Sequence, residues 1–406
     1  MKTKIIAFSL FAFTGAAVAA YNDGQPWGVP PQTQVDPVPV TQPTVNPITN
    51  QRPKVEVVFA LDTTGSMGGL INAAKEKIWS IATTLASSDP APEIRMGLVA
   101  YRDRGDTYVT KVIPLSNDLD SIYAALMDFK ADGGGDGPES VNQALYDAVH
   151  GITWSQDPNA YKVVFLIGDA PPHMDYQDDV KYPATIAAAS AKGIVINVVQ
   201  AGQNGLTKRH WTRIAQLGDG AYFQVGQSGN AVALATPFDK DLAELSAKLD
   251  STRLYYGNDE EMVEKQRKMN ATDKLHAGSS LASRARRATF NASKSGEANL
   301  FGEGELVNDV ASGRVDLSDI EHHALPEPLQ AMTPAEQKAL IKETAAKRKE
   351  LQSRIGELAE QRTKYLKKKV EEMGGAKDSL DHKIYGVVRE QAASKGLHYD
   401  EDKVNY

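Results

Sequence analysis

Short apolar runs that alternate with amphipathic stretches are the feature of this sequence that most restricts its fold. Val55 to Leu61 (VEVVFAL) and Val163 to Ile167 (VVFLI) are nearly continuous apolar runs, as expected for strands that are covered on both faces. Between them, apolar residues recur every three or four positions from Leu70 to Ile81, which predicts a helix. The complete series predicts strands at 55–61, 94–101, 108–113, 163–167, 194–199 and 221–225, and further helices at 119–129, 140–149, 178–192, 207–217 and 239–249.

This alternation predicts an α/β fold with a doubly wound, mostly parallel sheet flanked by helices, as in Rossmann-like proteins. The strand at 108–113 precedes Pro114 and is expected at an edge of the sheet. In sheets of this kind, binding sites lie at the carboxyl ends of the strands. Functional residues are therefore expected in the loops that follow Leu61, Phe129 and Ile167.

The composition excludes several classes of function. The chain has 406 residues and no cysteine, so disulfides, thiolate zinc sites, iron–sulfur clusters and cysteine nucleophiles are excluded. Its 45 basic and 52 acidic residues give a formal charge of −7, which argues against a nucleic-acid partner. The length predicts two or three structured regions.

The N-terminus has the pattern of a secretory signal peptide. Lys2 and Lys4 precede an apolar run that is too short to span a bilayer, and Ala17-Val18-Ala19 is a small-residue cleavage site. We therefore interpret residues 1–20 as a signal peptide and expect a secreted or periplasmic protein of a bacterial envelope. Residues 21–53 contain eight of the 20 prolines and are expected to form an extended linker.

Three loops at predicted strand ends concentrate oxygen-bearing side chains. Their sequences are DTTGSM (62–67), DGGGDGPE (132–139) and GDAPPH (168–173). Carboxylates and hydroxyls without thiolates suit Mg²⁺, Ca²⁺ or Mn²⁺ and suit zinc poorly. Asp62, Asp136 and Asp169 would repel one another unless a cation or protons neutralised them. The alternative is that Asp62 and Asp136 are only turn and N-cap residues of the following helices.

Asp62-Thr63-Thr64-Gly65-Ser66 resembles the D-x-[ST]-x-S signature of the von Willebrand factor type A (VWA) domain. The segments RMGLVAYRD (95–103), GGGDGPE (133–139) and LIGDAPPH (166–173) resemble further elements of bacterial members of that family. The resemblance covers about 200 residues and assigns 54–250 to a VWA domain. In this family the signature is the first part of a metal-ion-dependent adhesion site (MIDAS).

The resemblance implies the following metal site. Thr64 and Ser66 match direct hydroxyl ligands, while Asp62 and Asp169 match carboxylates that act mainly through metal-bound water. Many members have a threonine ligand in the middle loop, where this chain has GGGDGPES. We expect Asp136 to replace that ligand, and Ser140 is the alternative. The expected ion is Mg²⁺, with Ca²⁺ or Mn²⁺ as alternatives.

The function that the resemblance implies is metal-dependent protein binding, in which a partner's acidic side chain completes the coordination of the cation. A second hypothesis is a metal-assisted hydrolase with His173 as general base. The sequence has no G-x-S-x-G, H-E-x-x-H or phosphate-binding glycine motif, so we expect that the protein is not an enzyme. Tyr101-Arg102-Asp103-Arg104 is expected to form ion pairs at the rim of the site.

The C-terminal third has two parts. Residues 251–330 are less periodic and are expected to be a mixed, irregular connection, in which Arg284-Ala285-Arg286-Arg287 forms a solvated helix face. Residues 331–406 are expected to be helical, with a long helix at about 333–373 that begins at a Thr333–Glu336 capping box.

The long helix carries an apolar stripe that includes Leu351, Ile355 and Leu358 and is interrupted by Arg348 and Arg362. Two packings are equally compatible: a coiled coil with itself or a partner, and a hairpin against 378–397. Residues 333–373 contain 11 basic and seven acidic side chains, so contact with an anionic membrane surface is a further, less favoured option. A third hypothesis for function follows, in which a structural envelope or assembly protein acts through this helix.

Overall fold

The computed structural model describes residues 52–400, apart from 136, 230–233 and 376–378. The expected signal peptide and nearly all of the proline-rich linker lie outside the described residues. Within them, no helix is both long enough and apolar enough to cross a membrane.

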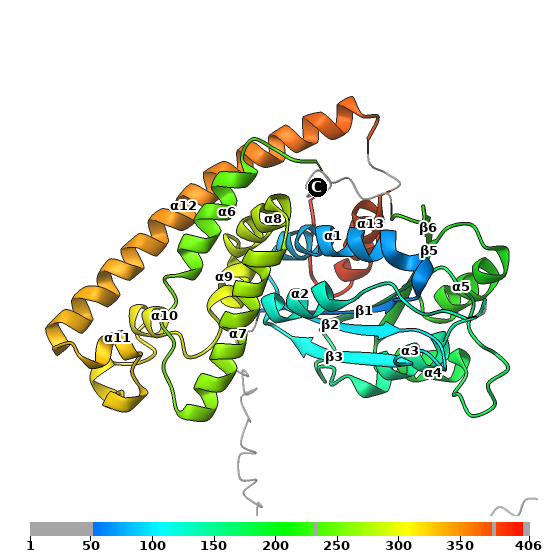
Figure 1. Ribbon diagram of the computed structural model, residues 1–406, viewed down its shortest axis with the longest axis horizontal. Coiled ribbons are helices and arrows are strands. Elements are labelled where there is room, and N and C mark those ends of the chain that lie inside the picture. Colours follow the sequence, from blue (N-terminus) through cyan, green and yellow to red (C-terminus); the bar gives the residue numbers. More distant parts are fainter. Residues whose placement is uncertain (1–51, 136, 230–233, 376–378, 401–406) are drawn as a thin grey trace, which may run out of the picture. The chain divides into compact units, whose positions relative to one another are not determined.

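A six-stranded sheet forms the centre of the α/β part, in the order β3-β2-β1-β4-β5-β6 (Figure 1). Every neighbouring pair is parallel except β2 and β3, which are antiparallel. The predicted fold class, a doubly wound and mostly parallel sheet with helices on both faces, is confirmed. The strands are β1 (Lys54–Asp62), β2 (Glu93–Tyr101), β3 (Thr110–Ser116), β4 (Tyr161–Gly168), β5 (Ile194–Ala201) and β6 (Tyr222–Val225).

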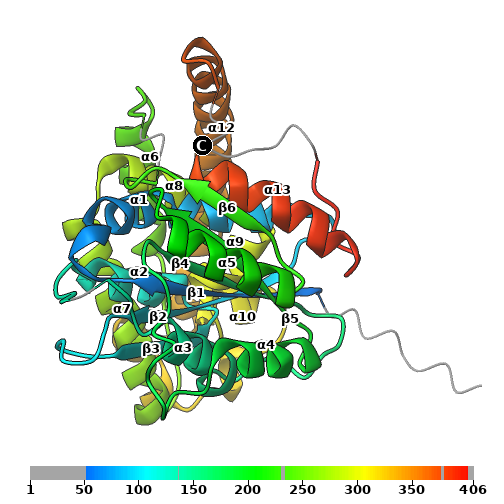
Figure 2. The same cartoon turned by 90° about the vertical axis from the view of Figure 1, so that its right-hand side faces the viewer.

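Two apolar layers separate the sheet from its helices. In β1, Val57 and Phe59 pack into the first layer and Val58 and Ala60 into the second, because successive side chains of a strand point to opposite faces. Figure 2 shows α1 and α13 on one side of the strands and α3 and α4 on the other. The helices of the first layer are α1 (Gly68–Ala86), α2 (Leu119–Asp128) and α13 (Leu380–Ala393); those of the second are α3 (Val141–Tyr146), α4 (Tyr182–Ala191) and α5 (Gly205–Leu217).

The structure differs from the predicted elements at three places in this part. Strand β3 continues through Pro114 to Ser116, and the pairing with β2 shifts register there, as is usual for a proline in an edge strand. The helix expected at 140–149 is α3 followed by a π-helical turn, η2 (Asp147–Gly151). The helix expected from 178 begins only at Tyr182, with Pro183 in its first turn.

The expectation of an irregular connection at 251–330 is wrong, because most of it is helical. In α7 the buried residues are Lys268, Ala271, Thr272 and Leu275, which have helical spacing. Two of the four are polar, so the buried face carries no clear hydrophobic signal. The helices of this part are α7 (Asp259–Gly278), α8 (Leu281–Asn291), α9 (Lys294–Phe301), α10 (Leu306–Ala311) and α11 (Glu327–Gln330).

The long C-terminal helix is confirmed as α12 (Pro334–Glu372), with the expected capping box between Thr333 and Glu336. It packs on α6 (Asp239–Asp250), α8 and α10, whereas α13 packs on α1, so the hairpin with 378–397, one of the two packings considered, is wrong (Figure 1). The apolar stripe of α12 is buried within the chain. It therefore has no exposed apolar seam for a coiled coil over these residues.

The two arginines that interrupt the stripe of α12 are buried and paired. Arg348 donates to both carboxylate oxygens of Glu305 at 2.6 and 2.7 Å, and Arg362 donates to Asp239 at 2.8 Å. Each pair joins α12 to an earlier part of the chain. The arginines therefore fix the position of α12 instead of interrupting its packing.

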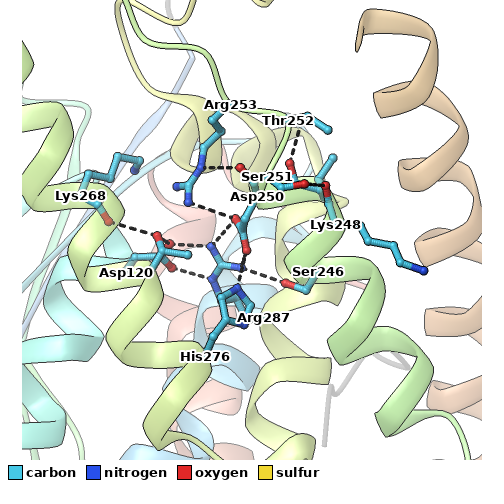
Figure 3. A network of polar contacts seen from close by, with 12 residues as sticks. Asp120, Ser246, Lys248, Asp250, Ser251, Thr252, Arg253, Lys268, His276 and Arg287 are labelled. Atoms are coloured by element: carbon cyan, nitrogen blue, oxygen red, sulfur yellow. Dashed lines mark hydrogen bonds and ion pairs between the residues drawn. The ribbon is translucent and has the colours of Figure 1, made fainter. Parts of the chain in front are cut away.

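The run at 284–287 is also buried in part, which corrects the expected solvated face. Arg287 is fully buried and lies at the centre of a polar network (Figure 3). Its guanidinium donates to Asp120 on α2 at 2.5 and 2.6 Å, and to Asp250 at the end of α6 at 2.7 and 2.9 Å. His276 on α7 also lies 2.7 Å from Asp250. One side chain of α8 thus joins α2 of the α/β part to α6, and through Asp250 to α7.

Helix α13 belongs to the core of the sheet although it lies far from the strands in sequence. Ile384 lies beside Phe59, Leu61 and Ile78, which are residues of β1 and α1. The side-chain amide of Gln391 exchanges two hydrogen bonds of 2.9 Å with that of Asn197 on β5. The core of the sheet therefore extends beyond the 54–250 range that the sequence indicated.

The Arg287 network predicts a loss of stability in acid. Burial alone would raise the pKa of Asp120 and Asp250, but the charge and hydrogen bonds of Arg287 outweigh it and lower both. Carboxyls with a lowered folded-state pKa contribute stability that is complete above their unfolded value, near 3.8, and that is lost as the pH falls through the folded value. We expect the free energy of unfolding, measured by urea titration, to fall steeply below pH 4.

The control for this prediction is Arg287→Met. At pH 7 the variant leaves two buried carboxylates without their main donor, and we expect it to lose about 3–5 kcal/mol of unfolding free energy. Below pH 4 its difference from the wild type should shrink, because the unfolded chain then takes up protons that the folded wild type, with its lowered carboxyl pKa values, does not, so the wild type loses the stability that the Arg287 pairs supply. A difference that stays constant between pH 7 and pH 3 would contradict this account.

The position of α13 predicts that its apolar face stabilises the sheet. Ile384→Ala removes a side chain that is 1% exposed, and we expect a loss of about 2–5 kcal/mol of unfolding free energy in urea. Glu390→Ala on the exposed side of the same helix is the matched control and should change stability by less than about 0.5 kcal/mol. Equal effects of the two substitutions would show that α13 does not support the core.

Candidate functional site

Three loops meet at the carboxyl edge of the sheet and are joined by main-chain hydrogen bonds. The amide of Asp132 donates to the carbonyl of Thr63 at 3.1 Å, and the amide of Gly65 donates to that of Gly133 at 3.2 Å. The amide of Glu139 donates to the carbonyl of Pro171 at 2.9 Å. The loops that follow β1, α2 and β4 are therefore held together as one surface, as their positions in the sequence predicted.

Asp62 ends β1 and is fully buried at the base of this surface. Its Oδ1 accepts hydrogen bonds from the amide and the hydroxyl of Thr64, at 2.9 and 2.6 Å. Its Oδ2 is buried without a hydrogen-bond partner among the described residues. Burial raises the pKa of Asp62 to about 7 despite the Thr64 bonds, and the charge of Asp169 adds to the rise.

Ser66 and Asp169 are joined by hydrogen bonds to one side chain, that of Gln227, which the sequence interpretation missed. Ser66 is exposed in the short turn η1 (Gly65–Met67), and Asp169 follows β4 and is half-buried. The side-chain amide of Gln227, just after β6, donates to Asp169 Oδ2 at 2.6 Å and to the carbonyl of Ser66 at 3.2 Å. The only sequence signal for Gln227 is its place after a strand, because the loop itself is ordinary polar sequence.

The middle loop (132–140) contains the two candidates for the third metal ligand, and the structure describes only one of them. Asp136, the expected third ligand, lies outside the described residues. Its alternative, Ser140, donates its hydroxyl to Asp103 at 2.9 Å and is buried, so it is held by another acid. Asp62 does not cap a helix: its carboxylate accepts from Thr64, and Thr64 occupies the cap position of η1.

Glu139 is a second residue that the sequence interpretation did not select. It is 3% exposed, and its Oε2 has no hydrogen-bond partner among the described residues. A Cβ added to Gly134 would lie 3.3 Å from Thr64 Cβ and 3.4 Å from Glu139 Oε1, so the glycine loop places this acid beside Thr64. Burial raises the pKa of Glu139 to about 9, helped by the charges of Asp62, Asp103, Asp106 and Asp169.

The acids and hydroxyls of this surface are the kinds of donor that a hard divalent cation prefers. Their donors are oxygens, and two buried carboxylate oxygens, on Asp62 and Glu139, have no hydrogen-bond donor in the described part of the chain. Among the described residues, no group of three His, Asp or Glu side chains is arranged to hold a metal ion. A cation here would therefore depend on the hydroxyls of Thr64 and Ser66 together with the acids.

His173 is fixed in a polar cluster beside the site. Its Nδ1 lies 2.8 Å from Asp175, its Nε2 lies 3.3 Å from Asp103, and its ring stacks on Tyr176 with 4.0 Å between centroids. Arg104 pairs with Asp179 at 2.5 Å and with Asp178 at 2.9 Å, so the expected rim ion pairs are present. Both ring nitrogens of His173 face carboxylates that hold the ring in place.

Comparison with known proteins agrees with this architecture. Residues 56–236 match the model of the von Willebrand factor A domain family. This part of the chain is a von Willebrand factor A domain. Domains of this family generally mediate protein–protein interactions.

Three curated relatives match over short segments. The chain is 39% identical over 93 residues to von Willebrand factor A domain-containing protein 7 of Rattus norvegicus, and 30% identical over 125 residues to alpha-protein kinase vwkA of Dictyostelium discoideum. It is 28% identical over 122 residues to an ariadne-like RING finger protein of Acanthamoeba polyphaga mimivirus. The matches cover 23–29% of this chain and only 10–19% of the relatives.

Solved structures are similar at low sequence identity. Proximal thread matrix protein 1 of the mussel byssus, solved with a zinc-occupied MIDAS motif, has a TM-score of 0.35 and 16% identity, over 43% of this chain and 42% of its own. The SpRpn10 VWA domain has a TM-score of 0.33 and 13% identity, over 45% of this chain and 100% of its own.

The burial of Glu139 predicts an unusual effect of its replacement. Glu139→Gln removes an acid that lacks a donor on one oxygen, and the new amide can donate to the neighbouring acids. In the presence of chelator at pH 7.5, we expect urea titration to show a gain of about 1–3 kcal/mol in unfolding free energy.

The matched control for this prediction is Asp103→Asn, the same change of acid to amide at an acid that has partners. Asp103 accepts from Ser140 and Tyr176 and faces His173, so its replacement should destabilise the protein by about 1–3 kcal/mol. A loss of stability in Glu139→Gln would contradict the interpretation of Glu139 as an uncompensated acid.

Proposed function

We propose that this protein is an exported, metal-dependent protein-binding module. In this proposal Asp62, Thr64, Ser66 and Asp169 hold a divalent cation, with Asp136 from the middle loop, and Mg²⁺ is the expected ion. The observation that carries the proposal is the buried Oδ2 of Asp62. It lies without a donor next to a hydroxyl ligand candidate and close to other acids.

The chemistry of the surface favours an acidic group on the partner. Ser66 is exposed and Asp169 is half-buried, so this side of the site is open to another molecule, while Asp62 and Glu139 lie beneath. When bound, a divalent cation supplies the positive charge that an incoming carboxylate requires. Without a cation the same surface is acidic and would repel that carboxylate, so capture should depend on the ion.

The surroundings of His173 favour binding over hydrolysis. A general base needs a nitrogen that can reach the water it activates. Here both ring nitrogens face carboxylates and one ring face is covered by Tyr176. We therefore propose a binding protein and not an enzyme.

In this proposal the C-terminal part has a structural role, because α12 packs on the helices that follow the domain. The apolar stripe of α12 packs on α6 and α8, so assembly through that stripe is disfavoured. The exposed side of α12 carries Lys364, Lys367 and Lys368, which leaves contact with an anionic envelope surface as a secondary role. Export of the protein to the periplasm or the exterior is part of the proposal and depends on residues 1–20.

Cation binding tests the proposed function directly. Isothermal titration of the chelator-treated protein with Mg²⁺, Ca²⁺ and Mn²⁺ should show one saturable site, and Asp62→Ala should weaken binding at least tenfold. Asp241→Ala, an exposed acid on α6, is the matched control and should leave binding unchanged. Equal cation binding by wild type and Asp62→Ala would overturn the proposal.

Partner capture is the second readout of this test. A pull-down from envelope extract with wild-type protein should lose its specific partner when chelator is added, and the Asp62→Ala protein should capture none. Capture that survives both changes would mean that binding occurs elsewhere on the chain.

A further inference from the structure

A hollow of about 430 Å³ lies at the opposite end of β4 from the candidate cation site. Its walls come from the loop at 152–160, the start of β4 and the end of α4. From Lys162 to Asp169 along β4 the two sites are roughly 20 Å apart at the usual rise of a strand. The volume is that of a pocket for a small organic molecule.

Lys162 and Lys192 line this hollow and Lys395 contacts its rim, and none of the three is paired with an acid among the described residues. Lys162 is 6% exposed and donates to the carbonyl of Lys192 at 3.2 Å, and Lys192 donates to the carbonyl of Val149 at 2.7 Å. Lys395, after α13, donates to the carbonyl of Pro158 on the rim at 2.7 Å. Each contact is with a neutral main-chain oxygen, so none of the three ammonium groups forms an ion pair with a carboxylate among the described residues.

The acids nearby are already engaged. Glu56 faces Lys162 across β1 and β4, but its carboxylate binds Arg95 at 2.7 Å and the amide of Ser155 at 2.9 Å. Asp157 lies in the loop and accepts from the amide of Asn159, and it does not line the hollow. The charged residues that line the hollow, Lys162 and Lys192, are therefore both basic, on a chain whose overall charge is −7.

The rest of the lining is apolar or neutral. Ile152, Trp154, Pro158 and Ala160 form an apolar wall, and Trp154 is held by a 2.9 Å hydrogen bond from its ring to the carbonyl of Ala148. A buried ammonium beside a flat apolar wall suits a ligand that has a negative charge at one end and an apolar body.

We propose that this hollow binds a small organic carboxylate, with its charge at Lys162 and Lys192 and its body against Trp154 and Pro158. The lysine contacts with main-chain carbonyls use one donor each, and an ammonium has three, so both can also bind the ligand. The site is independent of the cation site at the other end of β4.

Titration with benzoate, followed by Trp fluorescence and calorimetry, tests this proposal. We expect saturable binding of benzoate and at least tenfold weaker binding of benzamide, which has the same body without the charge. Lys192→Gln, on an exposed side chain, should weaken benzoate binding about tenfold, and so should Lys162→Met. Lys208→Gln, an exposed lysine of α5, is the matched control and should have no effect.

Three results of these titrations would overturn the proposal. Absence of saturable benzoate binding to the wild type, or equal binding of benzoate and benzamide, would overturn the proposal. Benzoate binding that is unchanged in both Lys192→Gln and Lys162→Met would place it elsewhere and also overturn the proposal. Lys192→Gln keeps the test valid if Lys162→Met does not fold.

Discussion

A single buried guanidinium, that of Arg287, determines how the two halves of this structure fit together. It is shared by Asp120 from the α/β part and Asp250 from the end of α6, and its charge offsets much of the cost of burying both acids at this junction. Along α12, Arg348 and Arg362 likewise form buried ion pairs with acids from earlier parts of the chain. The helical third is thus placed on the domain by paired charges, whose directional hydrogen bonds allow fewer positions than apolar contacts would.

The two ends of the central strands carry side chains of opposite charge. The carboxyl edge gathers Asp62, Glu139 and Asp169, while Lys162 and Lys192 line a hollow at the opposite end of β4. The loops at the carboxyl end are joined by main-chain hydrogen bonds, and the lysines lie at the start of β4 and the end of α4. A fold that is acidic overall can therefore present one acidic and one basic surface at a fixed separation.

The sequence alone predicts the features that depend on residues close to one another along the chain. Strands such as β1 and β4, the long helix α12 and the loops that carry Asp62 and Asp169 all have periodic or positional signals. Arg287 gave a misleading signal, because a charged residue is usually exposed and only its distant partners explain its burial. The only sequence signal for Gln227 was its place after a strand, and Glu139 was not selected, since the contacts that define both residues come from other loops.

The late position of α13 has a consequence for how the chain acquires its structure. The last strand of the sheet ends at Val225, but the helix that covers part of its first face begins at Leu380. Until that helix is synthesised, apolar residues of β1 and α1 lack one of their partners and remain accessible to other molecules. In a chain of this order, the core of the sheet is complete only when the C-terminal helix has been added.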